Sequence, residues 1–203
     1  MKSFRRLLIF FLIFVIPGCA VAATYPLYLR YRPMKDFPSL QQKIGSNLGI
    51  APFKDERPET LYIGYHTPLL GSPSYFKSDP FPLERVIKES LLGPLSRYGV
   101  ETTPISDWDG QPDSLKDLET DSILMIEIKR FWIEGTAAPF RTTAKTSIRF
   151  VIHLGVKKEG KVFTKNVELE KETTVSRLTP QGMEKILNGI LTEIFDSFLS
   201  NPY

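Results

Sequence analysis

Apolar and polar residues alternate along three consecutive segments in the second half of the chain, 123–132, 142–156 and 161–177. A period of two residues is typical of a strand with one buried face, because successive side chains point to opposite sides of a sheet. Glu159 and Gly160 supply a turn between the second and third strands. The apolar positions predicted to share the buried face are Leu124, Ile126, Ile128, Ile148, Phe150, Ile152, Leu154, Val156, Phe163, Val167 and Leu169.

Two other segments repeat apolar residues at helical spacing. In the first, Asp79 can cap the helix, Pro80 fits its first position, and Gly99 is a natural stop. Pro94 should bend or interrupt this helix, because proline has no N–H to bond the carbonyl of residue 90. Its apolar stripe comprises Leu83, Val86, Ile87, Leu91 and Leu95.

The C-terminal helix has the clearest pattern in the chain. Thr179 is its expected cap and Pro180 its expected first residue. We expect Ile190 and Ile194 to face the apolar side of the sheet. The whole stripe comprises Met183, Ile186, Leu187, Ile190, Leu191, Ile194, Phe195, Phe198 and Leu199.

Short strands are predicted at 48–53 and 100–105, and a further one is open at 61–65. Two amphipathic helices over one face of a mainly antiparallel sheet are the simplest arrangement that buries all of these apolar stripes. The sequence therefore predicts an α+β fold. It would be a two-layer domain with a mainly antiparallel sheet of about five strands and two helices packed on one face.

The start of the chain has the features of a lipoprotein signal peptide. A basic start precedes ten apolar residues, 7–16, which are too few to span a bilayer. Gly18 stands before Cys19, and this ending resembles the lipobox of bacterial lipoproteins. The resemblance implies cleavage of residues 1–18 and a diacylglyceryl or palmitate-type lipid anchor on Cys19. Ordinary secretion is the alternative, because residues 20–22 also fit a small-x-small cleavage site.

Residues 19–43 are predicted to be a lipidated N-terminus and an extended tether. Pro26, Pro33 and Pro38 stand in a segment with no helical or strand period, and prolines favour extended geometry. An alternative is that the tyrosines of this segment dock on a partner or on lipid headgroups. Residues 44–203 then form a single α+β domain.

The charge pattern excludes one class of partner. Lys2, Arg5 and Arg6 account for the whole formal net charge of +3, so the chain from Cys19 onward is formally neutral. Nucleic-acid binding needs clustered positive charge, so no nucleic-acid partner is expected. Cys19 is the only cysteine, which excludes an intramolecular disulfide. The fold must therefore depend on its hydrophobic core.

Several short features resemble the YajG-type lipoproteins of Gram-negative bacteria. They are Cys19, the turn Asp55-Glu56-Arg57 after the first strand, the stretch 163–166 in the last strand, and the closing helix over 186–198. The resemblance implies an uncharacterised envelope lipoprotein and carries no catalytic residues. A similar two-layer fold is used by auxiliary lipoproteins of ABC-type lipid or solute transporters, which is an alternative function. Ala20 is not the Asp that tends to retain enteric lipoproteins at the inner membrane. We therefore expect a protein anchored in the outer membrane and facing the periplasm.

Candidate catalytic groups are few. His66 and His153 lack the paired spacing of a zinc site, and the only thiol is expected to carry lipid. The loop 107–113 resembles the opening of a calcium loop, but Pro112 replaces the required glycine. Asp55 and Arg57 are expected to form an ion pair that stabilises a turn. We predict no enzyme, no metal and no cofactor, and a secreted periplasmic enzyme is the weakest alternative.

Aromatic residues gather in two segments with few core-period positions, the long stretch 59–78 and the hairpin 132–140. If these side chains are exposed, they form apolar patches of the kind that bind partners. If they fold under the sheet, they are core. The sequence thus predicts a non-catalytic, lipid-anchored envelope protein that binds another envelope component, a protein or a lipid. The candidate binding residues are Tyr62, Tyr65, Tyr75, Phe76, Trp132 and Phe140.

Overall fold

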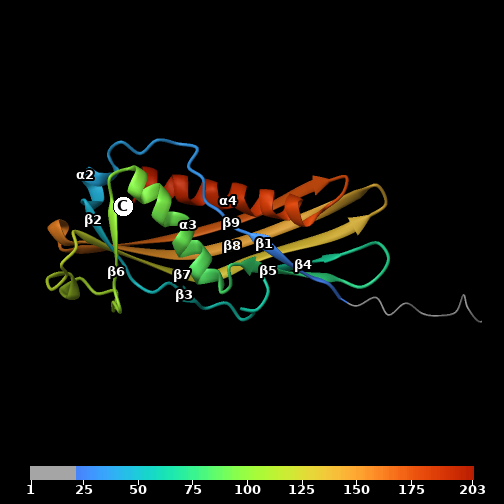
Figure 1. The fold of residues 1–203 in the computed structure, drawn as a ribbon, viewed down its shortest axis with the longest axis horizontal. Helices are drawn as coiled ribbons and strands as arrows, with labels where there is room; N and C mark the ends of the chain where they lie inside the picture. The colour runs from blue at the N-terminus through green and yellow to red at the C-terminus, as the bar shows by residue number, and fades with distance from the viewer. Residues whose placement is uncertain (1–21) are drawn as a thin grey trace, which may run out of the picture.

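The computed structural model describes residues 22–203, so Cys19 and the signal peptide expected at 1–18 lie outside the described residues. Within that range the chain forms a nine-stranded mixed sheet and three α-helices (Figure 1). The predicted fold, with about five mainly antiparallel strands and two helices, is therefore wrong. The helices are α2 (Leu40–Ile44), α3 (Leu83–Arg97) and α4 (Pro180–Ser200), and short 3-10 turns are η1 (Asp113–Leu115) and η2 (Lys157–Glu159). The strands are β1 (Thr24–Tyr28), β2 (Asn47–Ile50), β3 (Lys54–Asp55), β4 (Gly64–Thr67), β5 (Ser74–Asp79), β6 (Glu101–Pro104), β7 (Ser122–Ala138), β8 (Arg141–Val156) and β9 (Lys161–Val175).

Strand β7 organises the sheet. One of its edges pairs antiparallel with β8, which pairs antiparallel with β9. Its other edge pairs in parallel with β2, then β3, then β4. Strand β6 extends the sheet beyond β2, while β5 and β1 extend it beyond β4. The prediction failed on strand number and direction because one edge of β7 pairs in parallel with three short strands.

The three long strands and their buried face are confirmed. The predicted core positions of β7 and β8, from Leu124 to Val156, are at most 2% exposed. Those of β9 are partly buried, because β9 is an edge strand. A β-bulge between Ile128 and Arg130 interrupts the alternation of β7. After the bulge the buried positions move from even to odd residue numbers. Phe131 therefore also faces the core, where its ring stacks on Phe150.

Helix α3 differs from its prediction at both its start and its middle. It begins at Leu83, because Asp79 is still the last residue of β5. It also continues through Pro94 to Arg97 without interruption. Leu91 and Leu95 lie buried on either side of the proline, so packing on the core holds the helix together despite the missing hydrogen bond.

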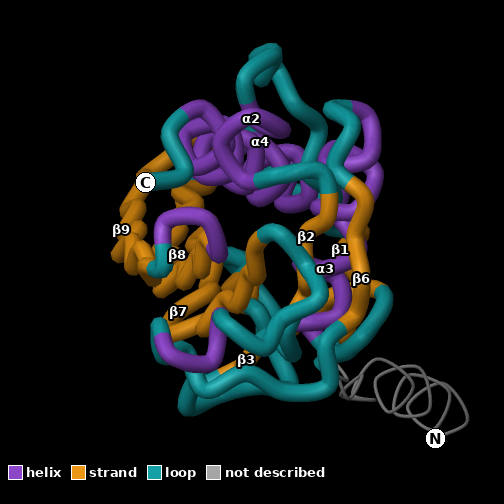
Figure 2. The backbone as a smooth tube through the Cα atoms, turned by 90° about the vertical axis from the view of Figure 1, so that its left-hand side faces the viewer, coloured by secondary structure: helices purple, strands orange, loops and turns teal. Residues whose placement is uncertain are grey.

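Helix α4 is confirmed in its cap and in its buried stripe. The hydroxyl of Thr179 accepts a hydrogen bond from the amide of Gly182 at 3.1 Å, and Pro180 is the first helical residue. Ile190 and Ile194 are 1% and 2% exposed. Phe195 stacks on Phe150 of β8. Figure 2 shows α2 and α4 on one side of the long strands, with β3 on the other side.

The segment expected as a tether is part of the fold from Thr24 onward. Strand β1 pairs in parallel with β5, and Leu27, Tyr31 and Phe37 are buried. The hydroxyl of Tyr31 donates a hydrogen bond of 2.8 Å to the buried carboxylate of Asp196 on α4. Burial, with this carboxylate, raises the pKa of the Tyr31 hydroxyl far above its ordinary value. The domain therefore starts near residue 24 and not at 44.

Between residues 22 and 203, no helix combines the length and the apolar character needed to cross a membrane.

Candidate functional site

Four aromatic side chains gather on the face of the sheet opposite α4. Tyr62, Tyr65, Tyr75 and Trp132 form a chain of ring contacts, which we call the aromatic cluster. The ring centroids of Tyr62 and Tyr75 are 4.8 Å apart, those of Tyr65 and Tyr75 6.5 Å, and those of Tyr65 and Trp132 6.1 Å. All four side chains are half-buried. Each ring thus packs on a neighbour and also presents part of its surface to solvent.

The pairing of β4 with both of its neighbours creates this cluster. Tyr65 lies opposite Tyr75 in the antiparallel pair with β5 and beside Glu134 in the parallel pair with β7. Trp132 is two residues before Glu134 and therefore shares its face. Ile133, between them, points to the core on the other face and is fully buried. Two segments far apart in the sequence thus supply one continuous aromatic surface.

Gly64 allows β4 to lie this close to β7. Its φ of +154° lies in a region that other residues rarely adopt. A Cβ at this position would stand 2.0 Å from the carbonyl oxygen of Ile133. The glycine therefore fixes the position of Tyr65, the next residue, against the rings on β5 and β7.

Polar groups border the cluster and orient its rings. The indole Nε1 of Trp132 donates a hydrogen bond of 3.1 Å to Glu134. Burial, together with the charge of Glu134, raises the pKa of the Tyr65 hydroxyl. The ammonium of Lys77 lies 5.5 Å from the centroid of the Tyr62 ring, which is cation–π geometry. Tyr65 therefore keeps its proton, and with it a hydrogen-bond donor, over a wide pH range.

Shallow grooves flank Trp132 on both sides. The first holds about 350 Å³ and is lined in part by Lys129, Arg130 and Arg149. The second holds about 450 Å³ and lies between β7, β8 and β9, with Glu134 in its lining. Arg130 and Arg149 are cross-strand partners, so two like charges face solvent side by side. Arg149 also pairs with Glu168 at 3.9 Å, and Glu59 and Glu134 line the grooves, so the surface beside the aromatic cluster carries charges of both signs.

Arg57 connects the start of the aromatic stretch to β7. Its guanidinium binds Asp55 through two hydrogen bonds of 2.8 Å, which confirms the predicted ion pair. It also donates to the carbonyl of Tyr62 at 2.9 Å and to that of Phe131 at 3.2 Å. The pair is buried and fully hydrogen-bonded, so it holds Tyr62 in place.

The structure brings four of the six predicted binding residues together and places the other two elsewhere. Phe76 is 3% exposed and belongs to the core on the helix side. Phe140 is 99% exposed at the tip of the β7–β8 hairpin. Sequence reasoning did not identify Glu134 or Arg130. The two-residue spacing of Glu134 from Trp132 along a strand was the available signal for the first of these.

The two histidines lie on opposite faces of the sheet. His66 points toward the helix side, near Met183, and its buried Nε2 has no hydrogen-bond partner. Burial lowers the pKa of His66. Nδ1 of His153 is 2.9 Å from the hydroxyl of Thr164 on the other face. Their positions give no shared site.

The loop that resembles a calcium site is held by hydrogen bonds between its own residues. Asp109 accepts hydrogen bonds from the amide of Gln111 at 2.9 Å and from the hydroxyl of Ser114 at 2.7 Å. These bonds lower the pKa of the Asp109 carboxyl. Across residues 22–203, no three His, Cys, Asp or Glu side chains lie together in a way that could hold a metal ion.

No protein-family model matches this sequence, and no curated protein matches it either. The resemblance to YajG-type lipoproteins therefore stays a prediction. Solved structures share the fold more clearly than the sequence. The protein XCC0632 of Xanthomonas campestris, described under the family DUF330, is 16% identical with a TM-score of 0.55. The match covers 88% of this chain and 95% of that one.

Two further structures are similar at lower scores. A putative neuraminyllactose-binding hemagglutinin homolog of Helicobacter pylori is 11% identical over 85% of this chain and 92% of that one, with a TM-score of 0.44. Lipoprotein GNA1162 of Neisseria meningitidis is 11% identical over 74% of this chain and 98% of that one, with a TM-score of 0.39. Of these three, only the Xanthomonas protein has a TM-score above one half, and at 16% identity it shows a shared fold alone.

Proposed function

We propose that this protein is a non-catalytic, lipid-anchored protein of the bacterial envelope that binds another envelope component through the aromatic cluster. The observation that supports this most strongly is the cluster itself. Tyr62, Tyr65, Tyr75 and Trp132 stay half-exposed on one side of the sheet, although the helix side has a large and well-packed core. Tyrosine and tryptophan are among the residues that most often dominate binding energy.

The surroundings of the cluster favour a protein partner that presents both polar and apolar groups. Arg130 lies on one flank of Trp132, Arg149 beside it pairs with Glu168, and Glu134 accepts a hydrogen bond from the indole. Phenol and indole groups offer hydrogen bonds as well as apolar contact, so the surface suits an amphipathic partner. Complementary charge would speed the encounter, and the rings would supply most of the affinity.

The anchor completes the proposal. Acylation of Cys19 would hold the domain at the membrane, and Ala20 favours the outer membrane, with the domain facing the periplasm. The short reach between Cys19 and Thr24 would keep the binding surface close to that membrane.

Variant capture tests the proposal. The full-length protein and its Trp132→Ala and Tyr65→Ala variants are immobilised and exposed to detergent extracts of the envelope, with circular dichroism recorded for each. We expect capture of a specific component by the parent protein and a loss of that capture in both variants, with unchanged spectra. Tyr28→Ala is the matched control, because Tyr28 is a 50% exposed tyrosine on β1, outside the cluster. Full capture by both cluster variants would contradict the proposal.

A further inference from the structure

One end of the sheet carries the tips of two hairpins. The β4–β5 loop, residues 68–73, and the β7–β8 turn, residues 139–140, both follow strands that run in the same direction. Thr67 pairs with Thr136, so the two loops begin at nearly the same level. Figure 1 shows both projecting from the same end of the molecule, with the β9–α4 connection beside them. We call this region the loop end.

Large apolar side chains stand exposed at both tips. Phe140 is 99% exposed, Leu70 88% and Leu69 58%. Single exposed apolar residues are ordinary, but here three project from two tips at the same end of the sheet. These tips are convex, so they fit a soft surface better than a groove in a folded protein.

Phe140 is held in an unfavourable conformation. Its φ is +67°, and among residues 22–203 no other residue except glycine has a positive φ. Glycine or asparagine suits this backbone region better than a bulky aromatic residue. The turn therefore presents the ring outward at a conformational cost, and the ring makes no compensating contact within the fold.

The charges at the loop end have one sign. Thr136, Thr143 and Thr174 lie side by side on β7, β8 and β9 and mark where the loop end begins. The described loops past this level contain Arg141 and Arg177 and no aspartate or glutamate. Apolar tips bordered by arginine match the boundary between acyl chains and anionic headgroups of a bilayer.

The first described strand, β1, begins toward the same end of the sheet. Thr24 pairs with Tyr75, Tyr75 with Tyr65, and Tyr65 with Glu134, so these residues lie at one level of the sheet. Strand β1 is parallel to β5, which leads away from the loop end, so the start of β1 at Thr24 is its end nearer to the loop end.

Simple lengths agree with this geometry. The five residues from Cys19 to Thr24 span at most about 17 Å. Phe140 is six residues beyond Glu134 along the hairpin, which is a comparable length. Cys19 and Phe140 can therefore reach the same plane.

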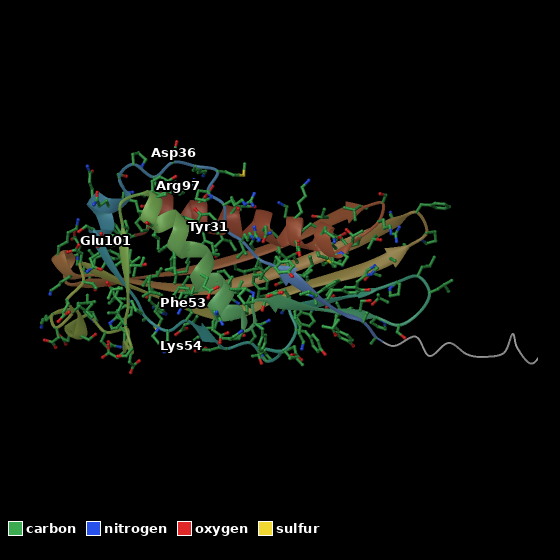
Figure 3. All side chains as sticks on the ribbon, viewed as in Figure 1. Tyr31, Asp36, Phe53, Lys54, Arg97 and Glu101 are labelled. Atoms are coloured by element: carbon green, nitrogen blue, oxygen red, sulfur yellow. The ribbon has the colours of Figure 1, made fainter. Side chains whose placement is uncertain are left out.

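We propose that the loop end rests on the bilayer that holds the anchor. Leu69, Leu70 and Phe140 enter the boundary between headgroups and acyl chains, and Arg141 and Arg177 face lipid phosphates. This inference rests on the lipid anchor of the proposed function. It orients the sheet so that its strands rise from the membrane, with the opposite end, marked by Glu101 in Figure 3, farthest from it.

Fluorescence from labelled cysteines tests this orientation. The full-length lipidated protein is reconstituted in vesicles of phosphatidylethanolamine and phosphatidylglycerol as the parent and as Phe140→Cys, Leu70→Cys and Glu101→Cys variants. Each is treated with an environment-sensitive thiol dye. The parent should take no label, because its only thiol carries lipid. Labels at 140 and 70 should emit at shorter wavelength and be quenched by brominated acyl chains. The label at 101 should be quenched by iodide in the water.

The outcomes separate the two claims. If the parent stays bound to the vesicles and unlabelled, while the labels at 140 and 70 are as open to iodide as the label at 101, the orientation is overturned and the anchor stands. Labelling of the parent at Cys19 would overturn the anchor, and the orientation with it. Leu70→Cys guards against a result that only reflects the loss of the phenylalanine ring.

Discussion

The rings of Tyr65 and Trp132 meet edge to face at 6.1 Å on the side of the sheet opposite α4. The contact joins β4 to β7, two strands that are distant in sequence and parallel in the sheet. Tyr65 also touches Tyr75, so the contact links both aromatic segments of the chain. These rings are only partly buried, so part of each ring stays open to contact from outside the fold.

Tryptophan fluorescence should distinguish the two tryptophans. Trp132 is half-buried in the aromatic cluster, while Trp108 is 4% exposed in a small second core. We expect Trp132→Phe to remove most of the emission that acrylamide or iodide quenches. Trp108→Phe should leave that accessible component in place. Equal quenching of the two variants would mean that the ring of Trp132 is covered.

Replacing Gly64 should destabilise the domain. In Gly64→Ala the new Cβ would stand 2.0 Å from the carbonyl oxygen of Ile133, so β4 must move away from β7. Overpacking of this kind costs about 1–3 kcal/mol in the free energy of unfolding. Denaturant unfolding measures the loss.

Gly93→Ala is the matched control for this substitution. Gly93 lies in α3, and a Cβ there would meet nothing within 4 Å. Alanine in a helix interior should stabilise the protein by about 0.5–1 kcal/mol. If both glycine variants changed stability in the same direction, the close approach of β4 to β7 would be in doubt.

Truncating Ile190 should cost about 2–5 kcal/mol of unfolding free energy, because the side chain is 1% exposed in the main core. Chemical denaturation of Ile190→Ala measures this. Lys185→Ala, an exposed position on the same helix, should change stability by less than about 0.5 kcal/mol. A result for Ile190→Ala as small as that of the control would mean that α4 stands apart from the sheet.

His66 should make stability depend on pH. Burial lowers its pKa below the ordinary value of 6.5, so the folded protein resists protonation of the ring. Its contribution is complete above about pH 6.5 and is lost as the pH falls through the lower folded-state pKa, since the unfolded chain binds the proton first. Unfolding at pH 7.5 and 5.5 should therefore show a smaller difference for His66→Gln than for the parent. Tyr28→Ala, a substitution at an exposed position on β1, should keep the parent difference.

The sequence predicted the long elements because each repeats its pattern many times. Strand β8 alternates from Arg141 to Leu154, and α4 has both a cap at Thr179 and a stripe that includes Ile190. Short strands carry too little pattern for this. Strand β3 has two residues, and β5 buries Phe76 and Ser78, so its inward face contains a polar residue. These segments form strands because they pair with neighbouring strands, and the sequence does not reveal that pairing.

The candidate site was predicted in pieces for the same reason. Tyr65 and Trp132 were assigned to separate binding segments, and only the parallel pairing of β4 with β7 joins them. Tyr75 and Phe76 were grouped together, yet β5 turns them to opposite faces, so one belongs to the cluster and the other to the core. The sequence did not predict β5, so it gave no reason to assign Tyr75 and Phe76 to opposite faces.

Site-specific photo-crosslinking in the envelope tests the central claim most directly. A photoreactive amino acid replaces Tyr65 in one variant and the exposed Tyr28 in another, and illumination is followed by identification of adducts. We expect a discrete adduct with one envelope component from position 65 and none from position 28. An absence of adducts at position 65, or the same adducts from both positions, would contradict a binding role for the aromatic cluster.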